Sequence, residues 1–180
     1  MQDQLIQTTP LHIEKQSASI WRVILNDPPF NLIGPQMIAA LQSAVGEMEA
    51  SPQLKVVIFE SAVPDFFIAH VDLLQVGVGN TEAGPTGMLP WPDALRRLET
   101  ASFVTIGVLR GRARGVGSEF LQALDMRFAS IEKGLLAQIE VGCGIIPGGG
   151  GLERLPRMLG RARAIEAICG ADEFDAVTAE

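Results

Sequence analysis

Two glutamates that stand twenty-one residues apart in glycine-rich surroundings could carry acid–base chemistry. Glu119 follows Gly115 and Gly117, and Glu140 precedes the glycine run 148–151. Two carboxylates in different environments can divide the giving and the taking of a proton at neutral pH, as a hydratase or an isomerase requires. Glycine lets the backbone approach a ligand, so that its N–H groups can point at an oxygen that gains negative charge. The alternative is that both glutamates are ordinary solvated residues.

The elements that must position these glutamates alternate between strand and helix patterns. Runs rich in β-branched and aromatic residues predict strands at Ser19–Leu25, Lys55–Glu60, Phe103–Leu109 and Met126–Ser130. Apolar spacing and breakers predict helices at 35–50, Asp93–Ala101, Gly117–Leu124, Gly151–Leu159 and Ala162–Ile168, and the first turn of another at Asp175–Glu180. Glu119 then falls in the first turn of a helix, where the dipole favours a carboxylate.

The segment Gly77–Pro92 has many breakers and no periodicity, which predicts a mobile loop that could serve as a lid or substrate wall. The strand–helix–strand start indicates an α/β fold. Strand–strand–helix units recur along the chain, which favours a spiral of turns over a simple Rossmann sheet.

The composition suits a single soluble domain over residues 1–180, because 47% of the residues are hydrophobic. A formal net charge of −7 argues against general affinity for nucleic acid or an anionic membrane. Phosphate must then be held by local positive charge. The two candidate groups, which could equally be ordinary surface charge, are Arg110, Arg112 and Arg114, and Arg154, Arg157, Arg161 and Arg163.

The cysteines and histidines do not form a metal-binding pattern. Cys143 and Cys169 lack a CxxC spacing, and His12 and His70 lie far from them in sequence, so no metal site is expected. Free thiols fit a reducing compartment. The chain shows neither a signal peptide nor an apolar run long enough to span a membrane, so we expect a cytoplasmic protein.

Three segments together resemble the crotonase superfamily, also called the enoyl-CoA hydratase/isomerase family. Phe66–Leu73 is similar to its F-x-A-G-x-D-L pattern, Leu109–Phe120 to V-x-G-x-A-x-G-G-G-x-E-L, and Gln138–Leu155 to P-E-x-x-x-G-x-x-P-G-x-G-G-x-x-R-L. Each segment is a moderate signal, whereas three in the family's order and spacing are a strong one. The resemblance implies a crotonase-like (ClpP/crotonase) α/β spiral of ββα turns.

The resemblance also implies a function, hydration of a 2-enoyl-CoA. The backbone N–H groups of Val71 and Val116 would hold the thioester oxygen, Glu119 would deprotonate the attacking water, and Glu140 would deliver a proton to the α-carbon. The substrate would lie against Phe30, Leu32, Ala69, His70, Val71, Asp72, Leu73, Gly115 and Val116. Coenzyme A would enter as part of the substrate, with no permanently bound cofactor, and the assembly would be a homotrimer or a dimer of trimers.

Several positions depart from the family pattern. Val116 and His70 stand where glycine is common, and valine tolerates positive φ poorly. His70 could act beside the oxyanion hole or pack away from it. Leu74 and Gln75 stand where relatives often have a lysine or arginine, which weakens phosphate binding by this loop. The C-terminal helices of ordinary members are absent from this sequence, so the chain is either a fragment or a naturally short member.

Two other functions stay open. A double-bond isomerase would use the same oxyanion hole and could use Glu140 alone, and a non-catalytic module would bind acyl-CoA without turnover. Other chemistries find no support, because the chain lacks a Walker A loop, a G-x-G-x-x-G turn and a G-x-S-x-G elbow.

Overall fold

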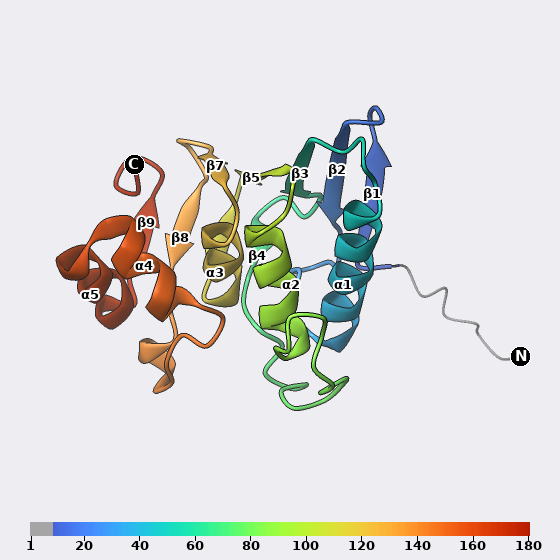
Figure 1. Cartoon of the computed structure of the whole chain (residues 1–180). Coiled ribbons are helices and arrows are strands. Elements are labelled where there is room, and N and C mark those ends of the chain that lie inside the picture. The colour runs from blue at the N-terminus through green and yellow to red at the C-terminus, as the bar shows by residue number, and fades with distance from the viewer. Residues whose placement is uncertain (1–8) are drawn as a thin grey trace, which may run out of the picture.

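The computed structural model describes residues 9–180, which form two β-sheets and the helices that pack on them (Figure 1). The larger sheet has the strand order β1-β2-β3-β5-β7, and the smaller one has the order β4-β6-β8-β9. Their bounds are β1 Leu11–Lys15, β2 Ile20–Leu25, β3 Val56–Ser61, β4 Phe66–Ile68, β5 Val104–Leu109, β6 Arg112–Arg114, β7 Met126–Ala129, β8 Leu135–Ala137 and β9 Glu173–Asp175. The helices are α1 Pro35–Glu49, α2 Pro90–Glu99, α3 Val116–Gln122, α4 Gly151–Leu159, α5 Arg161–Gly170 and the short 3-10 helix η1 Val141–Cys143.

A repeated unit connects the two sheets. One strand joins the larger sheet, the next joins the smaller sheet, and a helix follows: β3, β4 and α2; then β5, β6 and α3; then β7, β8 and α4. Successive units stack in parallel, since β3 pairs with β5, β5 with β7, β4 with β6, and β6 with β8, all in parallel. This arrangement confirms the predicted spiral of ββα turns.

The corner between the strands of one unit requires a glycine at Gly111. A Cβ at this position would lie 2.6 Å from the backbone carbonyl of Asp65 in the preceding turn of the spiral. The backbones of successive corners therefore touch, and a side chain here would separate the two turns.

The core lies between the larger sheet and the helices α1, α2 and α3. Its largest fully buried side chains include Phe59 on β3, Leu95 on α2 and Phe120 on α3. The rings of Phe59 and Phe120 meet edge to face with centroids 5.2 Å apart. A separate small cluster of Leu155, Ala164 and Ala167 joins α4 to α5. Glu119 lies next to Phe120, so the main core fixes the helix that carries it.

Most of the predicted long elements are confirmed to within a few residues. The structure adds β1 and the three-residue strands β4, β6, β8 and β9, for which the sequence shows no period. Helix α2 begins at Pro90 and not at Asp93, because proline is well tolerated in a first helical turn, where its missing N–H has no partner to lose. The predicted loop therefore ends at Leu89.

The segment after Asp175 forms a turn where the first turn of a helix was predicted. The Asp175 carboxylate accepts the N–H of Thr178 at 2.7 Å, and the Asp175 carbonyl accepts the N–H of Ala179 at 3.0 Å. Asp175 therefore accepts a backbone N–H as a helix cap would, but it is the last residue of β9 and no helix follows it through residue 180.

Candidate active site

Glu119 is buried and accepts hydrogen bonds from the glycine run. Only 1% of its surface is exposed. The N–H of Gly149 lies 2.9 Å from each carboxylate oxygen, and the N–H of Gly151, at the first position of α4, lies 2.8 Å from Oε1. The interpretation of Glu119 as an ordinary solvated residue is wrong. Helix α3 presents the carboxylate to the amino end of α4, where free N–H groups stabilise negative charge.

The surroundings of Glu119 act on its acidity in opposite directions. Burial raises the pKa of the carboxyl group because the charged form loses water, and the hydrogen bonds from Gly151 and Gly149 and the charge of Arg154 oppose this effect. The net result is a pKa above the usual range. A carboxylate in this state can accept a proton near neutral pH.

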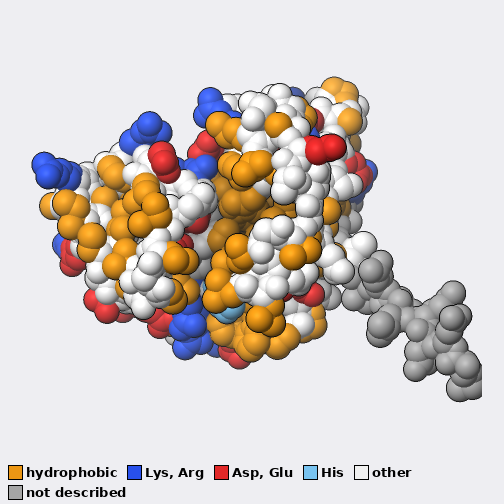
Figure 2. Space-filling model, turned by 90° about the horizontal axis from the view of Figure 1, so that it is seen from below, with side chains coloured by type: hydrophobic (Ala, Val, Ile, Leu, Met, Phe, Trp, Pro, Cys, Tyr) orange, Lys and Arg blue, Asp and Glu red, His pale blue; other side chains and the backbone are white. Residues whose placement is uncertain are grey.

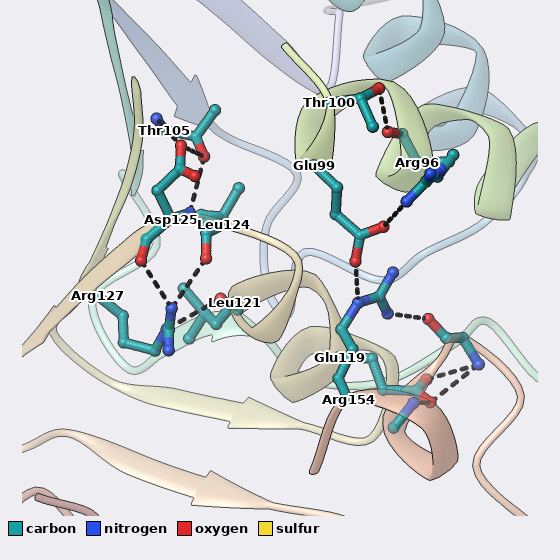
Figure 3. A network of polar contacts seen from close by, with 12 residues as sticks. Arg96, Glu99, Thr100, Thr105, Glu119, Leu121, Leu124, Asp125, Arg127 and Arg154 are labelled. Carbon is teal, nitrogen blue, oxygen red and sulfur yellow. Dashed lines mark hydrogen bonds and ion pairs between the residues drawn. The ribbon is translucent and has the colours of Figure 1, made fainter. Parts of the chain in front are cut away.

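Arg154 holds the backbone that contacts Glu119 (Figure 3). Its Nε lies 2.5 Å from a carboxylate oxygen of Glu99 on α2, and one of its terminal nitrogens donates to the carbonyl of Gly149 at 2.7 Å. The same peptide segment gives its N–H to Glu119. Arg154 thus links α2, α4 and the glycine run. The sequence analysis placed Arg154 only in a possible phosphate-binding group. Its position five residues after Gly149 was the available sequence signal for a contact with the glycine run.

Glu140 is the second buried carboxylate, with 8% of its surface exposed. Glu140 follows β8, and its Oε2 lies 3.3 Å from Nε2 of the Gln138 side chain. Burial raises the pKa of Glu140, and the nearby charge of Glu119 raises it further. The solvated interpretation fails here as well. A Cβ on Gly151 would lie 3.1 Å from Glu119 Oε1 and 3.0 Å from the Gln138 nitrogen that contacts Glu140, so the two carboxylates lie near each other.

Gly115 makes room for Glu140. Its φ is +51°, and a Cβ on it would lie 2.9 Å from Glu140 Oε1. Val116 is the first residue of α3 and does not adopt a positive φ. Val116 therefore does not need the positive φ that valine tolerates poorly, because the preceding glycine takes that conformation.

The predicted oxyanion donors are the backbone N–H groups of Val71 and Val116. Val71 is bridged to Ile33, with the Ile33 N–H bonded to the His70 carbonyl at 3.1 Å and the Asp72 N–H to the Ile33 carbonyl at 2.9 Å. Across residues 9–180, no protein acceptor is recorded for either valine N–H. Within these residues the fold thus uses neither N–H in a hydrogen bond, and their role as oxyanion donors stays a prediction.

Gly117 brings the two donor segments together. A Cβ on Gly117 would lie 2.8 Å from the Cβ of Ile68, so the start of α3 lies directly against the end of β4. Val116 immediately precedes this contact and Val71 follows it by a few residues. Gly115 thus allows the close approach of the Glu140 carboxylate, and Gly117 allows the close contact with Ile68.

Seven of the nine predicted substrate-binding residues, all but Gly115 and Val116, occupy two paired loops. The Ala69 N–H donates to the Phe30 carbonyl at 3.1 Å, and the ring of Phe30, which is 43% exposed, meets Phe66 edge to face. Leu32 is half-buried in the same loop. These contacts bring together the two segments that were predicted to hold the thioester and pantetheine.

Asn31 fixes these loops, and sequence reasoning gave it no separate role. It is fully buried with φ at +52°, a conformation that asparagine tolerates better than most residues. Its Oδ1 accepts the Asp27 N–H at 2.7 Å, and its Nδ2 donates to Ser61 Oγ at 2.8 Å and to the Phe67 carbonyl at 2.9 Å. The breaker pair Pro28-Pro29 was the only sequence signal of a special turn here.

The loop after Val71 carries no phosphate-binding cation. His70 is half-buried, and its Nδ1 lies 2.7 Å from the Val71 carbonyl, which it meets as a donor. Asp72 accepts the N–H of Leu74 at 3.0 Å and pairs with the Gln75 amide, while Leu73 is 62% exposed. Asp72 therefore caps its own turn.

Five of the seven arginines in the two predicted groups are paired with carboxylates. Arg110 contacts Glu60 at 3.0 Å. The other pairs are Arg112 and Arg114 with Glu173, Arg154 with Glu99, and Arg163 with Glu166. These contacts favour the surface-charge alternative for Arg110, Arg112, Arg114 and Arg163, whereas the largely buried Arg154 holds the Gly149 backbone.

Exposed hydrophobic side chains border the site. They are Leu73, Leu74, Val76, Val78, Met88, Leu89, Ile145 and Ile146. Seen from the side of these loops, the molecule has a hollow between the part that contains α4 and α5 and the larger remainder, with hydrophobic side chains along its walls (Figure 2). The loops next to the predicted site residues thus expose largely apolar side chains.

Other expected features concern metals, thiols and membranes. Within residues 9–180, no group of three or more His, Cys, Asp or Glu side chains is placed to hold a metal ion. Cys143 and Cys169 are free and exposed. No helix in this described part of the chain is both long and apolar enough to cross a membrane.

A spiral of ββα turns with two buried glutamates beside free backbone N–H groups defines a crotonase-type protein. The sequence model of the enoyl-CoA hydratase/isomerase family matches residues 15–180. The chain belongs to this family.

Three relatives illustrate the similarity. The short-chain-enoyl-CoA hydratase of Clostridium acetobutylicum is 31% identical over 155 residues, which cover 86% of this chain and 59% of that protein. The human mitochondrial methylglutaconyl-CoA hydratase is 30% identical over 166 residues, which cover 91% of this chain and 48% of that protein. The crystal structure of a Streptomyces avermitilis protein assigned to the enoyl-CoA hydratases has 42% identity and a TM-score of 0.88, over 95% of this chain and 62% of that one. The chain thus spans about half to three-fifths of these relatives.

Proposed function

We propose that this protein hydrates a 2-enoyl-CoA thioester by syn addition of water. The observation that supports this most directly is the pair of buried carboxylates, Glu119 and Glu140, with Glu140 next to Gly115, the residue before the proposed donor Val116. Hydration needs a base for water and an acid for the α-carbon on the same side of the substrate.

The environments of the two glutamates support different roles. Glu119 accepts backbone N–H bonds from Gly149 and Gly151, which stabilise its anion and suit a general base. Glu140 has longer contacts with the Gln138 amide. Burial and the negative charge of Glu119 raise its pKa despite a hydrogen bond from its own backbone N–H, which favours its protonated form. Glu119 takes a proton from water, and Glu140 gives one to the α-carbon. The proton then returns from Glu119 to Glu140 before the next turnover.

The thioester oxygen gains negative charge while the water oxygen bonds to the β-carbon. In this proposal the N–H groups of Val71 and Val116 hold that oxygen. Removing one donor of this kind from a hydrolase costs about 3 kcal/mol in the barrier, so the pair would supply a substantial part of the rate enhancement.

The substrate enters as a coenzyme A thioester, and we propose no permanently bound cofactor. Its pantetheine lies along the paired loops that contain Phe30 and Ala69, where the backbone is already held by hydrogen bonds. A homotrimer or a dimer of trimers, in the cytoplasm, is the proposed setting. Sedimentation of the purified chain measures the first point.

The test follows the loss of enoyl-thioester absorbance with crotonyl-CoA for the wild-type chain, Glu119→Gln and Glu140→Gln. Both substitutions should lower turnover at least about a hundredfold, because each removes one proton-transfer group. Glu132→Gln, an exposed glutamate on another face, is the matched control and should leave turnover unchanged. Wild-type turnover in either of the first two variants would contradict the assigned role of that residue.

Two alternatives have their own outcomes in this test. If the wild-type chain does not hydrate crotonyl-CoA but moves the double bond of a 3-enoyl-CoA, and Glu119→Gln keeps that activity, the isomerase function is favoured, since Glu140 alone can shuttle that proton. If the folded wild-type chain binds crotonyl-CoA without turning over either substrate, the function is acyl-CoA binding.

A further inference from the structure

The indole N–H of Trp91 lies beside the proposed catalytic carboxylate without a hydrogen-bond partner. Trp91 is the second residue of α2, and its ring packs against Phe120 with centroids 6.0 Å apart. Its Nε1 is inaccessible to solvent and meets no acceptor within residues 9–180. A buried donor without an acceptor is unfavourable, so a group of this kind at a site calls for an explanation.

Gly149 locates this N–H relative to Glu119. The position of a Cβ on Gly149 would lie 2.9 Å from Trp91 Nε1 and 3.0 Å from the carboxyl carbon of Glu119. The nitrogen and the carboxyl carbon are therefore at most about 6 Å apart, yet no hydrogen bond joins the two side chains. One oxygen atom that bonds to both groups would span this separation once the indole ring turns enough to uncover Nε1, since each hydrogen bond spans about 3 Å.

We propose that Trp91 donates a hydrogen bond to the same oxygen that Glu119 binds: the attacking water during hydration, and the 3-hydroxyl group of the product. This inference rests on the proposed hydratase function. As the water oxygen forms its bond to the β-carbon, its proton moves to Glu119, while Trp91 keeps its own proton. The indole N–H orients the oxygen and stabilises its negative charge, which also serves the hydroxyl group that leaves in the reverse reaction.

The chain offers a matched pair of substitutions. Trp91→Phe removes the N–H and keeps an aromatic ring against Phe120. Trp21→Phe is the control, because Trp21 on β2 also has a buried Nε1 without an acceptor among the described residues, but its ring lies beneath Lys15 in another part of the core. We expect kcat/KM for crotonyl-CoA hydration to fall roughly tenfold in Trp91→Phe and to stay within about twofold of wild type in Trp21→Phe.

A binding measurement tests the inference without turnover. The wild-type chain should bind 3-hydroxybutyryl-CoA more tightly than butyryl-CoA, and Trp91→Phe should reduce this ratio about tenfold while leaving the affinity for butyryl-CoA unchanged. The chain has two tryptophans, so Trp91 is the only one left in Trp21→Phe. Its fluorescence should shift on adding 3-hydroxybutyryl-CoA and change less with butyryl-CoA.

The outcomes separate this inference from the hydratase proposal. If the chain binds both thioesters but never hydrates crotonyl-CoA, the hydratase proposal fails, and a lower binding ratio in Trp91→Phe still supports the contact. An unchanged ratio overturns the inference whether or not hydration occurs. The inference is also overturned if Trp91→Phe leaves the ratio of the two thioester affinities unchanged but shifts the acid limb of the kcat/KM profile with pH. In that case the N–H acts on Glu119 directly.

Discussion

Gly149→Ala should disable Glu119 without changing any ionisable group. Gly149 does not adopt a positive φ, so alanine is acceptable to the backbone, and the effect of the substitution is steric. The added methyl group would lie 3.0 Å from the carboxyl carbon of Glu119 and 2.9 Å from Trp91 Nε1. The carboxylate must therefore move away from the N–H groups of Gly149 and Gly151, which it accepts at 2.9 Å and 2.8 Å.

The size of the effect follows from the hydrogen bonds that are lost. A hydrogen bond to a charged group contributes about 1.5–3 kcal/mol. Loss of one such bond, at about 2 kcal/mol, lowers kcat/KM for crotonyl-CoA hydration roughly thirtyfold. Because hydrogen bonds to the anion lower the pKa of Glu119, their loss raises it, and the acid limb of the kcat/KM profile should move to higher pH.

The control for this experiment is Gly148→Ala. An added Cβ at Gly148 meets no atom within 4 Å, so the variant should retain wild-type kinetics. Circular dichroism and thermal unfolding establish that both variants are folded. The reasoning is refuted if Gly149→Ala retains wild-type kcat/KM, or if Gly148→Ala loses as much activity.

The remaining predictions concern two ion pairs. Arg154→Met should lower kcat/KM roughly tenfold and move the acid limb of the pH profile to higher pH. The substitution removes a charge that lowers the pKa of Glu119, and it releases the Gly149 carbonyl. The control Arg157→Met, at an exposed position of α4, should change neither kcat/KM nor the pH profile. Asp93→Asn should lower the free energy of unfolding by about 2 kcal/mol at neutral pH, measured by urea titration. Burial would raise the pKa of Asp93, but hydrogen bonds from Thr86 and Arg97 outweigh it and hold that pKa below its usual value. The extra free energy of unfolding of the wild type over Asp93→Asn is therefore fully present above the unfolded-state pKa of Asp93 and is lost as the pH falls through its folded-state pKa. Equal pH dependence of the two proteins' unfolding free energies would contradict this account.

Prediction from the sequence succeeded where a local pattern has a local cause. The helix at 35–49 follows from apolar spacing after Gly34-Pro35, and the strands at 20–25 and 104–109 follow from runs of β-branched residues. The two glutamates were found because glycines surround them. Both are buried and contact neighbouring groups, while their roles stay predictions.

Prediction failed where a residue's role depends on a partner far away in the chain. Strands β4, β6 and β8 have three residues each, too few to show a period, and they form because the parallel neighbours in the smaller sheet supply their hydrogen bonds. The fixed loop at Asn31 depends on carbonyls more than thirty residues away. No single-segment pattern contains such a contact.

The sequence by itself determined which groups could do chemistry: Glu119, Glu140 and the glycines that leave the backbone N–H groups uncovered. The tertiary structure alone decided how those groups are set. It placed Arg154 on the Gly149 carbonyl, assigned the positive φ to Gly115 and not to Val116, and buried the Trp91 nitrogen near the carboxylate of Glu119. The physical reason is that acidity and hydrogen bonding depend on burial and on atoms within about 3 Å, and folding brings those atoms together from distant parts of the chain.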